Sequence, residues 1–200
     1  MSPLARRAAV PMCVFMRGLR TLAMVVLVLA APFGIPAAQA RDTSLDALFD
    51  LLKKAKTAAE AQTVEGAIWV AWMHSGDAEA DGLMQLGAAA MEAGDAEAAL
   101  AVFDKLVARR PDFAEAWNKR ATVHYMMGDF AASVADIQRT LALEPRHFGA
   151  LSGLGLIYDA LGKEQPALRA FEAALRIHPR LPGARAYVDA VREKTAGLPI

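Results

Sequence analysis

A repeating period of 34 residues constrains this 200-residue chain more than any other feature of its sequence. Written in rows 80–113, 114–147 and 148–181, the chain places the same kind of residue in the same column. The recurring columns are small residues (Gly87, Ala121, Gly155), large apolar residues (Phe103, Ile137, Phe171), turn glycines (Gly94, Gly128, Gly162) and prolines (Pro111, Pro145, Pro179). Self-similarity at a fixed period of this length indicates stacked copies of one structural unit.

Each row predicts two short helices. In row 114–147, Trp117 and Ala121 follow each other at helical spacing, and Gly128 interrupts the pattern. A second apolar stripe passes through Ile137 and ends at Pro145, which cannot continue a helix. One such hairpin cannot bury its apolar face alone, whereas stacked neighbours can. We therefore expect an all-α fold, a short α-solenoid of antiparallel helix hairpins.

The central row resembles a tetratricopeptide repeat (TPR). Its stretch WNKRATVHYMMGDFAASVADIQRTLALEP is close to the family consensus. The stretches AAMEAGDAEAALAVFDKLVARRP and LSGLGLIYDALGKEQPALRAFEAALRIHP match on either side, and the central row departs from the pattern at Arg120, His124 and Thr140. The resemblance implies a non-catalytic scaffold whose first helices line a concave groove for a peptide or a partner helix.

Residues 1–40 have the pattern of a secretory signal peptide. Four arginines and no acidic residue precede an unbroken apolar run at 22–31, and Ala38-Gln39-Ala40 offers a cleavage site after Ala40. We expect export to a bacterial periplasm, with translation starting at Met1, Met12 or Met16. An uncleaved anchor is the alternative, although the apolar run is short for a span of about 20 residues.

The segments that flank the three rows also have helical patterns. Residues 41–79 predict a degenerate hairpin that caps the first row, with Trp69 in register with Phe103 and Gly76 ending its second helix. Residues 182–200 predict a capping helix and a tail, because a solenoid needs a polar-faced helix over its last apolar edge.

Charge and cysteine content narrow the classes of partner. Without residues 1–40, 18 Lys and Arg stand against 22 Asp and Glu, a net charge of −4. A mildly acidic chain argues against nucleic acid, which is bound by basic surfaces, and no membrane insertion is expected after signal removal. The single cysteine, Cys13, lies in the leader, so the exported part has no thiol chemistry.

No catalytic or metal-binding pattern is found in the sequence. The four histidines follow no metal-ligand spacing, and His124 falls in a packing column. Gly153 and Gly155 lack the preceding strand and the third glycine of a phosphate-binding loop. We expect neither an enzyme nor a cofactor.

The expected groove is the stripe one position beyond Trp117 on the first helices. In the central row, Asn118 offers an amide that both donates and accepts, and Lys119 and Arg120 add positive charge that suits a carboxylate. Core packing and solvated surface are the competing interpretations. The candidate binding residues are Asn118, Thr122, Tyr125, Met126, Lys119, Met91, Ser152 and Asp159.

The sequence therefore predicts an exported adaptor that binds a protein or peptide of unknown identity. The alternative is a structural subunit or a self-associating component of an envelope complex. A third hypothesis is an enzyme that uses His124 or His147 with acidic residues.

Overall fold

The computed structural model describes residues 45–196, which fold into nine α-helices and no strand. The helices are α1 (Leu45–Lys54), α2 (Ala58–Trp72), α3 (Ala78–Glu92), α4 (Ala96–Arg109), α5 (Ala114–Met126), α6 (Phe130–Leu143), α7 (Phe148–Ala160), α8 (Glu164–Ile177) and α9 (Pro182–Ala196). The expected leader 1–40, its cleavage site after Ala40 and residues 197–200 lie outside the described part. The described helices are all too short or too polar to span a membrane.

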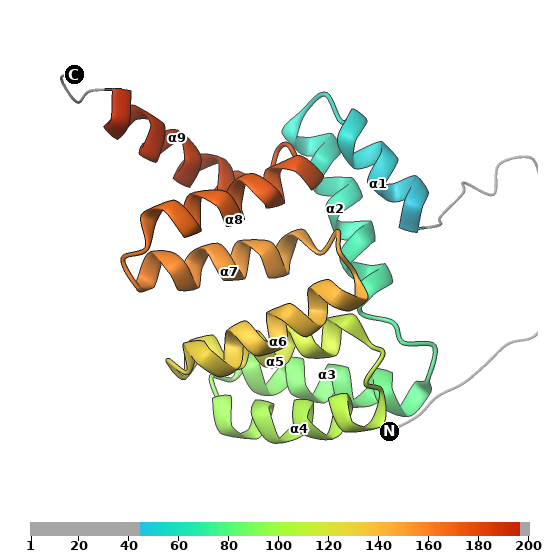
Figure 1. Cartoon of the computed structure of the whole chain (residues 1–200). Coiled ribbons are helices and arrows are strands. Elements are labelled where there is room, and N and C mark those ends of the chain that lie inside the picture. The colour runs from blue at the N-terminus through green and yellow to red at the C-terminus, as the bar shows by residue number, and fades with distance from the viewer. Residues whose placement is uncertain (1–44, 197–200) are drawn as a thin grey trace, which may run out of the picture. The chain divides into compact units, whose positions relative to one another are not determined.

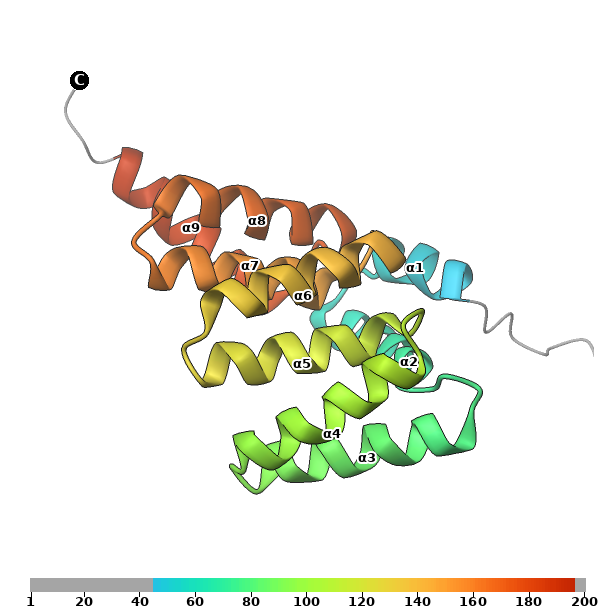
Figure 2. The same cartoon turned by 60° about the horizontal axis from the view of Figure 1, so that its bottom comes forward.

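The six helices from α3 to α8 form three stacked hairpins, one for each row of the sequence (Figure 1). Figure 2 shows the same stack from another side. The expected all-α solenoid is confirmed. The first helices contact one another directly, α3 with α5 and α5 with α7, so they lie on the inner side of the stack.

The turn inside each hairpin depends on glycine. Gly94, Gly128 and Gly162 have φ angles of 76°, 79° and 65°. This left-handed conformation costs little without a Cβ atom. In the first two rows an aspartate follows directly, and Asp95 and Asp129 each accept the backbone N–H three residues further on. That bond caps the second helix and starts it at a fixed residue.

The small and the large apolar columns meet inside each hairpin. A Cβ atom on Gly87 would lie 2.6 Å from Cζ of Phe103, so only glycine allows this approach. The third row repeats the arrangement. In the central row Ala121 takes the small position and the shorter Ile137 the large one, and both are buried. The methyl group that Ala121 adds relative to glycine is thus accommodated because Ile137 is smaller than phenylalanine.

One departure of the central row, Arg120, is explained by an ion-pair network. Arg120 donates two hydrogen bonds of 2.7 Å to the buried carboxylate of Asp136 and one of 2.8 Å to Asp104. Its guanidinium also lies 4.8 Å from the ring centre of Trp117. Hydrogen bonding by Asp136 raises the pKa of Arg120. The positive charge predicted for a ligand carboxylate is therefore bound to two acidic residues of the protein itself.

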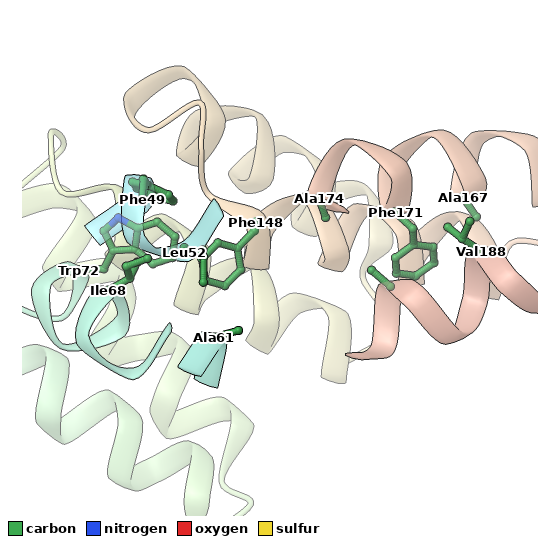
Figure 3. Close-up of a cluster of buried hydrophobic side chains, with 11 residues drawn as sticks. Phe49, Leu52, Ala61, Ile68, Trp72, Phe148, Ala167, Phe171, Ala174 and Val188 are labelled. Carbon is green, nitrogen blue, oxygen red and sulfur yellow. The ribbon is translucent and has the colours of Figure 1, made fainter. Parts of the chain in front are cut away.

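The N-terminal hairpin α1–α2 does not cap the first row. Its apolar side chains pack against the third row, in one cluster that runs from Phe49 and Trp72 through Phe148 to Phe171 and Val188 (Figure 3). In Figure 1, α2 lies crosswise to the stacked helices, along the side of the stack where α7 begins. The expected role as a cap of the first row is corrected, because the aromatic side chains of α2 contact the start of α7.

Trp69 shows the difference from a repeat most clearly. Instead of filling its own hairpin as Phe103 does, its indole lies over α7, where a Cβ atom on Gly149 would be 2.6 Å from the indole Cη2. The ring also meets Phe148 edge to face, with 5.5 Å between centres. A larger residue than glycine at 149 would displace the indole.

Further contacts hold α2 and the turn before it against the third row and its neighbours. The indole of Trp72 stacks on His147 with 4.0 Å between ring centres. Glu65 lies 3.1 Å from Nε2 of the buried His178, at the end of α8. The guanidinium of Arg180 donates to the backbone oxygens of Ala55 and Lys56 between α1 and α2.

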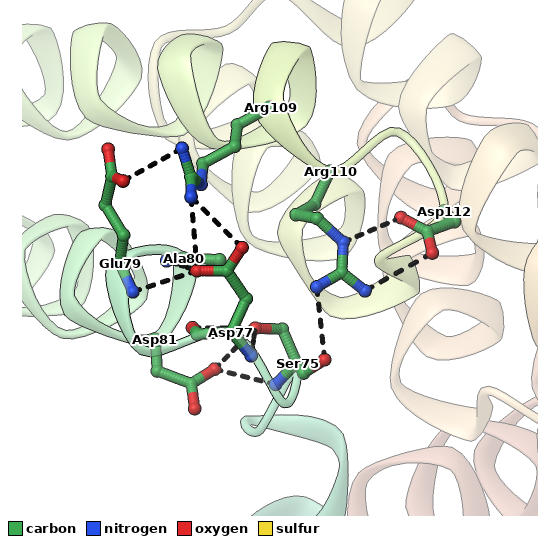
Figure 4. Close-up of polar contacts among 8 residues, drawn as sticks. All are labelled: Ser75, Asp77, Glu79, Ala80, Asp81, Arg109, Arg110 and Asp112. Atoms are coloured by element: carbon green, nitrogen blue, oxygen red, sulfur yellow. Dashed lines mark hydrogen bonds and ion pairs between the residues drawn. The ribbon is translucent and has the colours of Figure 1, made fainter.

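The linker between α2 and α3 is fixed by polar contacts (Figure 4). Asp77 caps α3 and pairs with Arg109 of α4 at 3.1 Å, while Arg110 donates to the backbone oxygen of Ser75. Asp81 accepts from both the amide and the hydroxyl of Ser75, each at 2.7 Å. These bonds to Ser75 lower the pKa of Asp81.

The last helix, α9, packs on α8 at the far end of the stack. Ala184, Val188 and Val191 are buried, and the ring of Tyr187 lies 4.5 Å from that of Phe171. The helix therefore covers the apolar side of the third row.

Candidate peptide-binding groove

A hollow of about 190 Å³ opens between α5, α6 and α7. Four of the predicted binding residues line it: Asn118, Thr122, Tyr125 and Ser152. The remaining lining residues are Ala121, Ser133, Ile137, Gly149, Gly153 and Leu156. We call this the α5–α7 hollow. Glycine at position 153 of α7 leaves room in it, because a Cβ atom there would lie 3.5 Å from Ile137, another lining residue.

A second hollow of about 230 Å³ lies on the other side of α7, against α8 and α9. It shares Ser152 and Leu156 with the first hollow. The other lining residues are Phe171, Leu181, Gly183, Ala184 and Tyr187. We call this the α7–α9 hollow. The two hollows therefore flank one ridge of α7.

Asn118 is held by a buried polar network. It is 8% exposed, and its amide donates to Oε2 of Glu115 at 3.1 Å. The same oxygen lies 2.8 Å from Nε2 of the fully buried His147. The other ring nitrogen accepts the N–H of Ala150, so the imidazole carries its proton on Nε2 and donates it to the carboxylate. The network orients Asn118 at the edge of the hollow and uses one of its two N–H donors.

Ser152 differs from Asn118 because its hydroxyl has no partner. The Oγ atom is buried and makes no hydrogen bond with any residue of the described part. A buried unpaired hydroxyl costs free energy, so a partner from outside the chain would be favourable there.

Thr122 and Tyr125 complete the polar side of the first hollow. The Thr122 hydroxyl donates to the backbone oxygen of Asn118 at 2.9 Å. The ring of Tyr125 packs against Phe130, with 5.6 Å between centres. Both side chains are thus placed by contacts within the second row.

The other four candidates do not line either hollow. Met126 is 51% exposed at the end of α5, and Met91 packs against the core of the first row. Asp159 is exposed on α7 near Tyr187, whose pKa is raised first by burial and then by this carboxylate. Lys119 lies 3.4 Å from the Glu115 carboxylate, so its charge is bound within the protein.

Gly149, Gly153 and Glu115 were not identified from the sequence as residues of the site. Gly149 and Gly153 stand four residues apart on a first helix, a spacing that leaves one helix face bare and could have indicated the hollow. Glu115 could not be recognised, because its buried partner is His147, which lies 32 residues further on at the end of the same row. Across the described residues, no three His, Cys, Asp or Glu side chains gather in a way that could hold a metal ion.

Stacked antiparallel hairpins with an open inner side define a helical-repeat scaffold. The sequence matches the Tetratricopeptide repeat family over residues 80–123 and again over residues 119–182. It is 40% identical over 153 residues to a TPR repeat-containing protein of Rhizobium etli, which covers 76% of this chain and 75% of the relative. The chain therefore belongs to the tetratricopeptide repeat family.

Other similar proteins share the repeat over part of the chain. Tetratricopeptide repeat protein 36 of Bos taurus is 37% identical over 92 residues, 44% of this chain and 49% of the relative. Among solved structures, the first TPR of Spaghetti (RPAP3) bound to the HSP90 peptide SRMEEVD has a TM-score of 0.56 at 22% identity, covering 60% of this chain and 97% of that one. MamA has a TM-score of 0.54 at 23% identity, covering 76% and 82%. These two structures bear on the fold alone.

Proposed function

We propose that the protein is a non-catalytic adaptor that binds a segment of a partner protein across α5 and α7. Tetratricopeptide repeats are generally protein-interaction scaffolds. The observation that carries the proposal is the α5–α7 hollow, which gathers Asn118, Thr122, Tyr125 and Ser152 on the inner helices. The polar side chains lie beside an apolar floor, the combination that binds both the main chain and a side chain of a peptide.

The test is capture of a partner from native extract by the immobilised protein. Tyr125→Ala combined with Asn118→Ala is expected to reduce the amount captured. Because Asn118 also bonds Glu115, the thermal midpoint of each variant is measured first. Val70→Ala is the control, since it removes an exposed apolar side chain of α2 that lines neither hollow. Equal capture by the double variant and the control would place the binding site elsewhere.

We propose further that the protein is exported and acts in a bacterial periplasm. The support is the basic, apolar and small-residue pattern of residues 1–40. Mass spectrometry of the protein recovered from the envelope tests this proposal. A product that begins at Arg41 agrees with cleavage after Ala40, and a product that retains residues 22–31 would favour the anchored alternative.

Self-association is a second candidate because one helix face of the first row is open. Leu86 occupies the column in which Arg120 meets Asp104 of the preceding row. No row precedes α3, and Leu86 is 57% exposed. If this face joins two copies, Leu86→Glu lowers the sedimentation coefficient to that of a monomer. A wild-type protein that is already monomeric at high concentration speaks against this candidate.

A further inference from the structure

The volumes of the two hollows indicate what they can hold. Pockets for small molecules and cofactors are usually about 300–1,000 Å³. The α5–α7 and α7–α9 hollows measure about 190 and 230 Å³. A cavity of about 150 Å³ already accommodates a group the size of benzene. Each hollow is therefore of a size for one apolar side chain.

The charge of the lining excludes an acidic or a basic segment. Among residues 45–196, no charged side chain lines either hollow. The two nearest cations on α5 are paired inside the protein, Lys119 with Glu115 and Arg120 with Asp136 and Asp104. A charged side chain placed in either hollow would lose water without gaining a partner.

Two polar groups can bind the main chain of such a segment. The Ser152 hydroxyl is buried without a partner between the hollows, and Asn118 stands at the edge of the first. Both can donate and accept hydrogen bonds, as the amide groups of a peptide require. The lining thus pairs two apolar sites with two groups suited to a peptide backbone.

The spacing of the hollows selects the backbone conformation. The hollows lie on the two sides of α7, and packed helices are about 8–10 Å apart. In a polyproline II helix, three residues per turn and a rise of 3.1 Å place residues i and i+3 on one side, about 9 Å apart. In a β-strand, residues i and i+2 share a side but are only about 7 Å apart. The spacing therefore favours polyproline II.

We propose that the groove binds an uncharged polyproline II segment with two apolar side chains three residues apart, one in each hollow. This inference rests on the proposed function and names the chemistry of the partner. The side chains cross the ridge of α7, and Ser152 and Asn118 bond the peptide groups between them.

The probe is a capped, fluorescein-labelled peptide with the core Leu-Pro-Pro-Leu, titrated with the purified protein and followed by fluorescence anisotropy. Two matched peptides carry Leu-Pro-Leu-Pro or Asp-Pro-Pro-Asp in its place. Each is expected to bind roughly tenfold more weakly, since a misplaced or charged side chain forfeits the burial of an apolar one. Equal binding of the three peptides, or a preference for the acidic one, overturns the inference.

Variants that fill the hollows provide the second readout. Gly153→Leu enters the α5–α7 hollow, because a Cβ atom there would be 3.5 Å from Ile137, an ordinary contact. Gly183→Leu enters the α7–α9 hollow, where nothing lies within 4 Å of a Cβ atom. Gly82→Leu is the matched control on α3, equally open and lining neither hollow. The first two variants should weaken binding at least about tenfold, and the control should leave it unchanged.

Capture of a partner from native extract separates this inference from the proposed function. If Gly153→Leu abolishes capture while the Leu-Pro-Pro-Leu peptide fails to compete, the groove binds a partner of other chemistry and the inference alone is wrong. If capture survives both Gly153→Leu and Gly183→Leu, the groove is not the binding site and both proposals fail.

Discussion

A methyl group added at Gly149 tests whether the N-terminal hairpin docks on the third row. In the native fold a Cβ atom at this position would lie 2.6 Å from Cη2 and 3.2 Å from Cζ2 of Trp69. Contacts below 3 Å are not tolerated, so the indole has to move. Because the same ring packs on Phe148 and Trp72, its movement loosens α2 from α7.

Gly153→Ala is the matched control, since Gly153 lies one turn further along the same helix. Its Cβ atom would be 3.5 Å from Ile137, which is ordinary van der Waals contact. Replacing glycine by alanine inside a helix stabilises by about 1 kcal/mol, and both variants gain this contribution. Overpacking costs about 1–3 kcal/mol and applies only to Gly149→Ala. The two variants should therefore differ by about 1–3 kcal/mol in the free energy of unfolding, with Gly149→Ala the less stable.

Urea denaturation followed by tryptophan fluorescence measures this difference. For a domain of this size, 1 kcal/mol corresponds to about 2–4 °C in the thermal midpoint, so a melting curve gives an independent check. Gly149→Ala should also change the native emission spectrum, because Trp69 and Trp72 move. Equal stability of the two variants, with unchanged native fluorescence, would refute the docking of α2 on α7.

Three further predictions concern buried or paired charges. Glu115→Ala should lower the free energy of unfolding by about 3 kcal/mol in urea denaturation, because it leaves the imidazole N–H of His147 and the amide of Asn118 unpaired. Glu115→Gln should lower it less, and equal losses in the two variants would contradict this account. Arg120→Leu introduces the residue type of the neighbouring rows but should lower the free energy of unfolding by about 3 kcal/mol, since Asp136 is left buried and charged. Adding Asp136→Leu should recover most of this loss, and a double variant without recovery argues against a stabilising pair. The hydrogen bonds from Ser75 hold the pKa of Asp81 below its usual 3.8. The stability that they contribute is therefore present above about pH 4 and is lost as the pH falls through the pKa of the folded state. The thermal midpoint should fall between pH 6 and pH 3, and it should fall by less in Ser75→Ala.

The repeats could be predicted from the sequence because their determinants are local. Turn glycines, apolar stripes and prolines act within a few residues, and stacking repeats them at a fixed period. The contact between Gly87 and Phe103 follows from that period, as do the left-handed turns. The same reasoning placed Asn118 and Tyr125 on the inner side, because the side-chain direction on a helix is set by position alone.

The placement of the N-terminal hairpin could not be predicted in this way. Its partners are distant in sequence, and Glu65 and His178, for example, are 113 residues apart. The register of Trp69 with Phe103 is a local match, and it carries no information about which surface the free apolar face of α2 meets. In the structure that face packs against α7, where Gly149 leaves room for the indole of Trp69.

The charges of the groove were misjudged for a related reason. Arg120 and Lys119 lie beside the inner stripe in sequence, and a free cation there would attract a carboxylate. The acidic residues that bind Arg120 come from the second helices of two rows, Asp136 on α6 and Asp104 on α4. Such pairs form only when the rows stack and bring α4 and α6 beside α5. The sequence of α5 alone therefore overstates the positive charge that is free in the groove.

The hairpin and the groove form one structure, because Gly149 belongs to both. It lines the α5–α7 hollow and also lies under the indole of Trp69, so a displaced indole can shift the start of α7 that borders the hollow. Gly149→Ala should therefore weaken binding of the Leu-Pro-Pro-Leu peptide as well as stability, although no contact of the groove itself is removed. Gly153→Ala should raise stability and weaken binding only through the volume of one methyl group. If Gly149→Ala lowers stability but leaves peptide affinity intact, α2 stabilises the fold without affecting the hollow.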